Sequence, residues 1–573
     1  MKRIINILLL IALITFPRIN YAKGQTYEEK YNLDFRIVDN FYGWYSDVNN
    51  SYIRFSVDST DINHPIKFSQ AERWGFREKM SLTLYMPQLL LLPAFSDSLL
   101  EVKISYKCKN LETGRLFVTS LNKQMDILIT DSICLQNDDN FREDSLEMTT
   151  KDTRFLFLSL QAVGKDSTYT EWPVGPVEQT IPHEISISRI TLQSGRTNIN
   201  DLPFQDIEAP NVDKSKILVL PPDTLLTGKQ LSRISGRITA LGETVHGSGK
   251  IGWARTNFIK SSVLNNQTNL IIYELPLLMM LYFNKYVQGA NDINENKLKE
   301  LTKKMASESE PVLELAKWLR EYNKTALEKV SFWGMDCKYQ TNELEEFLKD
   351  YLQIINQEAR SSTVDSLISV LDIRDADKIK DMAITTLHII KNNWQELSDV
   401  LAEDIEIITF YLESLIKAEV TYKNNYYERD WHMFKTTSFL IDYHCKPHQT
   451  VVISCHLSHA NYLTDHTPLH KSYGSYMKKE YKEEYGCVLQ IVGEDTVNAL
   501  TGKEFERKTL PPFSSNSLEA VFSKSGVKYG YIDAKELNEI VKLRMQGSHH
   551  EPTSRIERYI NPRSQVQGVL FIN

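Results

Sequence analysis

The motif Gly-Glu-Thr-Val-His-Gly at positions 242–247 places a carboxylate and an imidazole close together between two glycines. It closes a short apolar run at 237–241, where a strand is expected to pass into a loop. Glycine allows the backbone to approach a ligand closely and to adopt angles that other residues avoid. Loops at the carboxyl ends of strands are also where α/β sheets bind substrates. Glu243 and His246 are therefore the first candidates for acid–base chemistry.

Acidic and histidine side chains also follow two later apolar runs that predict strands. Glu274 ends the first run, and a carboxylate there needs a reason because isolated burial of a charge is costly. The second run, 451–455, leads directly into His456 and His459. Each residue taken alone is more often structural than functional, but three strand ends with Glu or His predict a cluster at one edge of a sheet. Arg255, on the next expected helix, is a candidate to join it.

Such a cluster has two chemical uses, and spacing alone does not decide between them. A neutral histidine can act as a base on water while a carboxylate orients its ring. Alternatively, His246, His456 or His459 could hold a divalent metal together with a carboxylate and leave one position open. The sequence contains no Gly-x-Ser-x-Gly elbow, which disfavours a serine hydrolase, and it contains no P-loop.

The beginning of the chain has the pattern of an export signal. Residues 1–22 combine a basic start, an apolar core and a small-residue cleavage site, so we expect a signal peptide there. No cysteine lies near that cleavage site, and a lipid anchor is not expected. No later segment has the ~18 uninterrupted apolar residues of a membrane span. The protein is therefore expected to be periplasmic or secreted.

Residues 25–205 are expected to form an all-β sandwich or jelly roll, because short runs alternate apolar and polar residues between turn signals. Their opening, at 32–36 and 43–44, resembles galactose-binding-like jelly rolls. A domain of that kind implies a glycan partner. Four aromatic residues are candidates to stack on sugar rings, although core packing or an ordinary surface position is the simpler reading of each: Trp44, Trp74, Tyr85 and Trp172.

The rest of the chain is expected to be a linker, residues 206–227, followed by an α/β domain with a central sheet, residues 228–573. A long helical block at 341–428 is predicted to be inserted in this domain. It forms either a lid over the site or a helical layer on the sheet. The fold class is thus multidomain, an N-terminal β-sandwich or jelly roll followed by an α/β domain with a large helical insertion.

The composition excludes some partners. The chain has 573 residues, 42% hydrophobic and 24% charged, with a net charge of −8 and no basic stripe, so nucleic acid is not an expected partner. Six cysteines are few for an exported chain of this length. Cys108 and Cys134 could pair, and the other four lie in or beside apolar runs, where buried thiols are expected.

From residue 228 to the end, the chain resembles the erythromycin esterase family. The resemblance is collinear, and it rests on Arg255 and on blocks at 240–247, 271–274, 318–323, 332–336, 428–433, 454–459, 473–476, 510–512, 517–519 and 567–572.

This resemblance implies a hydrolase without a metal or other cofactor, which opens a macrolide lactone by activating water. Macrolide inactivation is in turn a route to antibiotic resistance. By position, His246 is implied as the general base and Glu243 as the group that orients it. The other implied residues complete a polar cleft that binds substrate and stabilises the oxyanion: Arg255, Glu274, Arg429, His456 and His459.

The leading hypothesis is an exported hydrolase of a carboxylic ester or macrolactone, with a small-molecule substrate that is glycosylated or carried on a glycan. One alternative is a metal-dependent hydrolase that uses the same His/Glu cluster, which predicts loss of activity on chelation. The other is a non-catalytic glycan-binding protein on an esterase-like scaffold. It predicts glycan binding that His246→Ala leaves unchanged, and no turnover of any ester.

Overall fold

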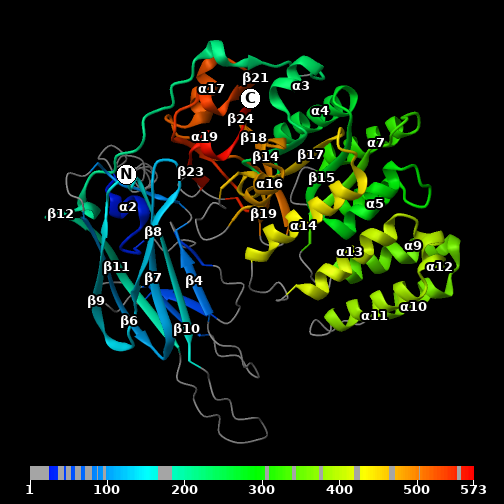
Figure 1. Ribbon diagram of the computed structural model, residues 1–573. Coiled ribbons are helices and arrows are strands. Elements are labelled where there is room, and N and C mark those ends of the chain that lie inside the picture. The colour runs from blue at the N-terminus through cyan, green and yellow to red at the C-terminus, as the bar shows by residue number, and fades with distance from the viewer. Residues whose placement is uncertain are drawn as a thin grey trace, which may run out of the picture. The chain divides into compact units, whose positions relative to one another are not determined.

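The chain divides into two compact units, residues 1–207 and residues 208–573. The computed structural model describes residues 25–36, 44–46, 53–57, 66–70, 81–86, 88–94, 99–165, 183–222, 224–303, 309–337, 343–372, 379–418, 426–463, 471–501, 504–550 and 556–573 (Figure 1).

The N-terminal unit is a sandwich of two antiparallel sheets, as the alternating pattern predicted. Along β6 (Leu99–Lys109) every second residue is buried, so one face of the strand enters the core between the sheets. One sheet has the order β1 (Tyr45–Ser46), β4 (Ser81–Tyr85), β10 (Phe155–Gly164), β7 (Leu111–Leu121) and β8 (Ile127–Cys134), with β5 (Leu90–Leu91) beside β10. The other has the order β2 (Ile53–Val57), β3 (Ile66–Gln70), β11 (Glu184–Ser194), β6 and β9 (Asp138–Thr149), with β12 (Thr197–Asn198) beside β11.

The structure bears on two predictions about this unit. Trp44 is buried in the core, with its ring centroid 5.2 Å from that of Phe35, so it is not a sugar platform. Trp74 and Trp172 lie outside the described residues, and Tyr85 is half-buried. The suggested pairing of Cys108 with Cys134 is wrong: both are free thiols, and they lie on strands of different sheets.

The C-terminal unit contains the predicted central sheet, and this sheet has eight strands. Its central strands are parallel and buried along nearly their whole length, which explains why they read as continuous apolar runs. The order is β13 (Leu218–Val219), β21 (Tyr529–Asp533), β24 (Gly568–Ile572), β18 (Tyr485–Val492), β14 (Ile238–Glu243), β17 (Thr450–His456), β15 (Thr268–Pro276) and β16 (Ser331–Asp336). The segment predicted to be a linker therefore supplies an edge strand, β13, which pairs with β21 in antiparallel orientation.

Helices follow the strands, and those between residues 344 and 417 form a separate group. They begin with η4 (Leu344–Lys349), which contacts α5 (Leu277–Val287), and α5 in turn packs on β16. Figure 1 shows the group clustered beyond α5: α9 (Asp350–Ala359), α10 (Ser362–Val370), α11 (Ile379–Asn392), α12 (Trp394–Leu401) and α13 (Asp404–Lys417). The inserted block is thus an outer helical layer over α5. Within the described ranges, no helix has the length and apolar character needed to cross a membrane.

The two glycines of the 242–247 motif let other parts of the protein come close, rather than a ligand. A Cβ on Gly242 would lie 3.2 Å from side-chain atoms of Leu457 and Ala460. Gly247 has φ +74°, and a Cβ there would collide with the backbone of Asn498 in β19 (Thr496–Thr501). The predicted conformational freedom is used at Gly247, but the neighbour it admits is β19.

We expect Gly247→Ala to destabilise the protein because it combines left-handed backbone strain with this collision. Gly526→Ala is the matched control, since Gly526 has φ +78° and open space around it. The control should lower the free energy of unfolding by about 1–2 kcal/mol, and Gly247→Ala by at least ~1 kcal/mol more. Urea unfolding of both variants measures the difference, and equal losses would show that β19 moves aside.

Candidate active site

Four neighbouring strands end in polar side chains at the carboxyl edge of the C-terminal sheet. Glu243 ends β14, His456 ends β17, Glu274 lies near the end of β15, and Asp336 ends β16. Sequence reasoning placed the first three at strand ends and gave Asp336 no role. An acid that closes the apolar run at 331–335 is the signal that could have found it. The edge is where α/β sheets place ligands.

Glu243 holds two cationic or polar partners at once. Its Oε1 lies 2.6 Å from His246 Nδ1, and its Oε2 accepts a 2.8 Å hydrogen bond from Arg255 Nη1 on α4 (Gly249–Asn265). Burial alone would raise the pKa of Glu243, but Arg255 and then His246 outweigh burial and lower it to about 2. The carboxylate is therefore charged at all physiological pH values.

This carboxylate fixes the chemistry of His246. An ionised Glu243 only accepts hydrogen bonds, so a neutral His246 ring carries its proton on Nδ1 and keeps the lone pair of Nε2. The His246 side chain is 18% exposed, against 3% for Glu243. The arrangement presents a basic nitrogen to a reactant while its orienting acid stays buried.

Arg429, on α14 (Tyr426–His444), joins the ends of two other strands. Its guanidinium donates to both oxygens of Asp336 at 2.9 Å and to Glu274 Oε1 at 2.7 Å. The second oxygen of Glu274 accepts the backbone N–H of His456 at 2.8 Å. Burial would raise the pKa of Glu274, but His459 and Arg429 hold it well below its usual range. Glu274 thus uses one oxygen to bind Arg429 of α14 and the other to bind the backbone of β17.

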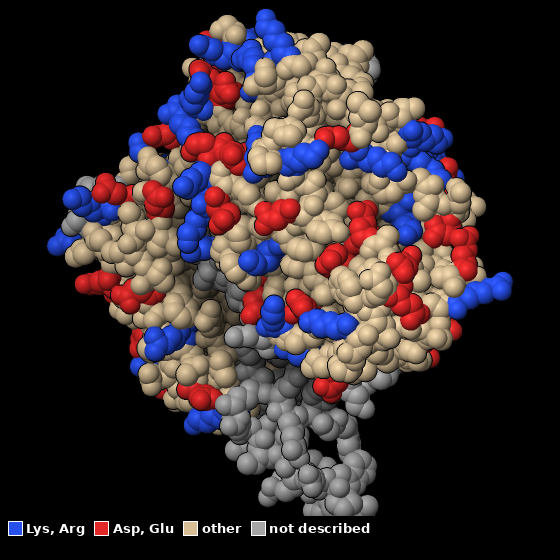
Figure 2. Space-filling view, turned by 45° about the vertical axis from the view of Figure 1, so that its right-hand side comes forward, with Lys and Arg blue, Asp and Glu red and all other residues tan. Residues whose placement is uncertain are grey.

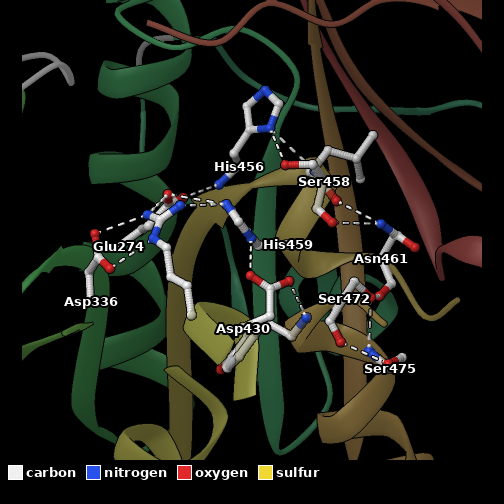
Figure 3. A network of polar contacts seen from close by, with 12 residues as sticks. Glu274, Asp336, Asp430, His456, Ser458, His459, Asn461, Ser472 and Ser475 are labelled. Atoms are coloured by element: carbon white, nitrogen blue, oxygen red, sulfur yellow. Dashed lines mark hydrogen bonds and ion pairs between the residues drawn. The ribbon is translucent and has the colours of Figure 1, made fainter. Parts of the chain in front are cut away.

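His459 is held between an acid and the guanidinium. Its Nδ1 lies 2.6 Å from Asp430 Oδ1, and its Nε2 lies 3.1 Å from Arg429 Nη1 and 3.5 Å from Glu274 Oε1 (Figure 3). Burial would lower the pKa of His459, but Asp430 and Glu274 raise it to about 9. The 3.1 Å approach of Arg429 fits a neutral ring with its proton on Nδ1, whereas a charged ring would direct Nε2–H to Glu274. Either way the ring has two fixed partners.

His456 has a different environment. Its Nδ1 accepts the backbone N–H of Ser458 at 3.3 Å and lies 2.7 Å from the Ser458 hydroxyl, so the ring proton belongs on Nε2. Burial, with His246 nearby, lowers the pKa of His456 to about 3 and keeps the ring neutral. Among the described residues Nε2 has no hydrogen-bond partner. The His246 and His456 ring centroids are 4.6 Å apart, and Figure 3 shows the His456 ring turned away from Glu274 and Asp430.

The seven predicted site residues therefore form two connected groups at one sheet edge. Glu243, His246 and Arg255 form the first group, Glu274, Arg429 and His459 form the second, and His456 stands between them. Sequence reasoning missed Asp336, Asp430 and Ser458. Asp430 contacts a histidine 29 residues later and Ser458 contacts one two residues earlier, and no periodic pattern marks either of them.

The residues after His246 read Gly-Ser-Gly-Lys-Ile-Gly, positions 247–252, which matches the glycine spacing of dinucleotide-binding loops. In the structure, a carboxylate side chain lies at the amino end of α4, where such loops bind a phosphate. Asp495 Oδ2 accepts the hydroxyl of Ser248 at 2.5 Å and the backbone N–H of Lys250 at 3.1 Å, and Ser248 Oγ caps Ile251. A phosphate would have to displace this carboxylate.

The same geometry bears on metal binding. Within the described ranges, no three or more His, Cys, Asp or Glu side chains are arranged to hold a metal ion. The cations beside the site acids are the guanidinium groups of Arg255 and Arg429.

Basic and acidic side chains are interspersed on the face shown in Figure 2. That view therefore shows no field of a single sign.

The fold and site define an α/β protein with a His–acid pair at the carboxyl edge of a mostly parallel sheet. The chain belongs to the erythromycin esterase family, because the family model described as erythromycin esterase matches residues 267–573, more than half of its length. The match begins after Glu243, His246 and Arg255. No curated protein matches the chain.

Solved structures similar to this chain include a Bacillus cereus protein, at 18% identity over 62% of this chain and 95% of that one, with a TM-score of 0.48. Another is a mutant erythromycin esterase in its open conformation, at 15% identity over 60% and 92%, with a TM-score of 0.38. The N-terminal region is similar to a carbohydrate-binding module in complex with β-1,4-galactotriose, at 9% identity over 26% and 88%, with a TM-score of 0.19. All three TM-scores lie below 0.5, so the family assignment rests on the family model.

We expect Arg429→Met to lower the free energy of unfolding by ~3–5 kcal/mol, because it leaves two buried carboxylates without their cation. Arg237→Met is the control: Arg237 pairs with Glu484 near the surface, where the side chains are 21% and 54% exposed, and should cost ~0–1 kcal/mol. Urea unfolding at neutral pH compares them. A cost for Arg429→Met no larger than the control would contradict the bridging role.

Proposed function

We propose that this protein hydrolyses a carboxylic ester or lactone, with His246 as the base that activates water. The observation that carries the proposal is the 2.6 Å contact between Glu243 and Nδ1 of His246. This contact leaves Nε2 basic, on a side chain that is more exposed than that of Glu243. Membership of the erythromycin esterase family supports the reaction class. The substrate class proposed is a small-molecule ester or macrolactone.

The reaction takes two steps. A water molecule gives a proton to His246 Nε2 as its oxygen attacks the carbonyl carbon, and the carbonyl oxygen takes the negative charge. The tetrahedral intermediate then collapses, the bond to the leaving oxygen breaks, and that oxygen receives the proton from Nε2. Glu243 remains ionised throughout and stabilises the imidazolium that exists between the steps. Arg255 keeps Glu243 charged and in place.

His456 is the proposed donor to the oxyanion. Its Nε2–H has no partner among the described residues, and its ring lies beside that of His246. A neutral donor held in a buried position stabilises charge that develops in the transition state without reorganising. Glu274, Arg429 and His459 act on this donor indirectly, because Glu274 holds the backbone of His456.

We also propose an extracytoplasmic location, from the signal-like residues 1–22. A glycan partner for the N-terminal unit is a further proposal, and Trp44 is not its binding surface because that ring lies in the core.

His246→Ala should lower kcat by roughly 10²–10⁴-fold on any ester that the protein hydrolyses, because the base is lost. His388→Ala, on helix α11, is the control for losing a histidine outside the site. The assay is a panel of esters and lactones, with macrolides and acylated sugars included. Wild-type activity should also fall as the pH is lowered, since protonation removes the lone pair of Nε2. Retention of full activity by His246→Ala would contradict the proposal.

Dialysis against EDTA should leave hydrolysis unchanged, because the site acids are neutralised by guanidinium groups. Metal content by mass spectrometry and the rate before and after dialysis are the measurements. A rate that falls with chelation and returns with added Zn²⁺ would favour the metallohydrolase alternative.

A further inference from the structure

Two buried glutamines bracket the loop that carries the proposed base. Gln490 lies in β18, directly opposite Glu243 in the parallel register, and its carbonyl accepts the backbone N–H of Thr244 at 3.1 Å. Gln546 donates its backbone N–H to the Thr244 carbonyl at 2.8 Å and accepts that of His246 at 3.0 Å. The backbones of both glutamines are thus part of the structure that positions Glu243 and His246.

The side chains of both glutamines, unlike their backbones, lack hydrogen bonds within the described residues. Gln490 is 0% exposed and Gln546 is 1% exposed, yet neither the oxygen nor the nitrogen of either amide has a hydrogen-bond partner among the described residues. Gln449, a third buried glutamine, bonds to Asn269 and to the backbone of Lys446, both at 2.7 Å. A buried amide without partners is costly, so two such amides beside one loop require an explanation.

The register of the sheet places one of these amides in line with the proposed chemistry. Glu243 has His456 as its partner on one side and Gln490 on the other, and partners in a parallel sheet project to the same face. The row across β18, β14 and β17 therefore reads Gln490, Glu243, His456. In this row Nε2 of His456 also lacks a partner. Unused hydrogen-bonding capacity thus lies on both sides of the Glu243 carboxylate.

We propose that Gln490 and Gln546 are specificity-determining residues that bind a neutral hydroxyl group of the substrate beside its ester. This inference rests on the proposed hydrolysis. A hydroxyl both donates and accepts, as a carboxamide does, so it satisfies an amide oxygen and an amide nitrogen together. An ionic substrate group is disfavoured at this position because Glu243 and Arg255 already neutralise each other. The substrate class is therefore an ester of a hydroxylated acid or of a polyol or sugar.

Two matched pairs of esters test the proposal, since each pair exchanges a hydroxyl for a methyl group. 2-Hydroxyethyl acetate and propyl acetate differ in the alcohol part, and methyl glycolate and methyl propionate differ in the acid part. In at least one pair, wild-type kcat/KM should favour the hydroxylated ester by about tenfold or more. When the methyl analogue binds, the amide groups that would bond to the hydroxyl stay without a partner. Gln490→Met and Gln546→Met should bring that ratio towards one, because the hydroxyl loses its partners.

Gln449→Met is the matched control. It removes a bonded amide, so it should lower the melting temperature and leave the ratio as in the wild type. Gln490→Met and Gln546→Met should melt at or near the wild-type temperature, because an amide without partners is replaced by an apolar chain of similar shape. Unchanged ratios in both variants would overturn the proposal. So would melting temperatures lowered as far as that of Gln449→Met, which would show that these amides are bonded in the folded protein.

Binding to the inactive His246→Ala protein separates this inference from the reaction itself. Saturation-transfer NMR with 2-hydroxyethyl acetate and propyl acetate should detect the hydroxylated ester preferentially, and Gln490→Met in the same background should remove the preference. If wild-type protein hydrolyses none of the four esters but this preference is observed, the proposed reaction fails on these probes and the binding role stands. Equal signals for the two acetates, before and after Gln490→Met, would overturn the binding role.

Discussion

Two buried carboxylates at the ends of neighbouring strands, Glu274 and Asp336, depend on one cation from another element, Arg429. Without that guanidinium, β15 and β16 would each end in an uncompensated buried charge, which proteins avoid. The dependence extends further, because Glu274 accepts the backbone N–H of His456 and so fixes where β17 ends. Helix α14 is therefore tied electrostatically to β15 and β16, and through Glu274 to β17, so the position of the proposed oxyanion donor follows from that tie.

Three histidines at this edge show how surroundings divide one residue type into different roles. His246 is oriented by a charged Glu243 and remains partly exposed. His456 is kept neutral by burial and presents an N–H. His459 lies between Asp430, Glu274 and Arg429, and it serves to join them. His246 and His459 both have Nδ1 beside a carboxylate, but Nε2 of His459 also lies beside Arg429 and Glu274, whereas Nδ1 of His456 accepts a backbone N–H. Residue type alone carries none of this information.

The sequence predicted the sheet well because parallel strands buried on both faces are continuous apolar runs. Their ends located Glu243, Glu274 and His456 at one edge for the same reason. The edge strand β13 was missed because a strand of two residues is too short to show an alternation of apolar and polar residues. Asp430 was missed because its role depends on a contact with His459, 29 residues later.

Local patterns can also mislead when the neighbouring structure is unknown. The glycine spacing at 247–252 is that of a phosphate loop, yet Asp495 caps the helix that follows it. Trp44 lies in a segment whose sequence resembles a carbohydrate-binding domain, but its ring is part of the core. In the first case the deciding residue, Asp495, lies almost 250 positions further along the chain.

The loop that carries His246 is held by segments that lie much later in the sequence. Thr244, His246, Gly247 and Ser248 bond to residues between Gln490 and Gln546, some 250 positions later. A ribosome makes those residues long after the loop itself, so a nascent chain that stops before them lacks the contacts that fix its proposed base in place. The proposed base would then be fixed only when β18 and the segments that follow it join the sheet. For the proposed hydrolase, this order of synthesis would keep hydrolysis from beginning until β18 and the segments that follow it have been made.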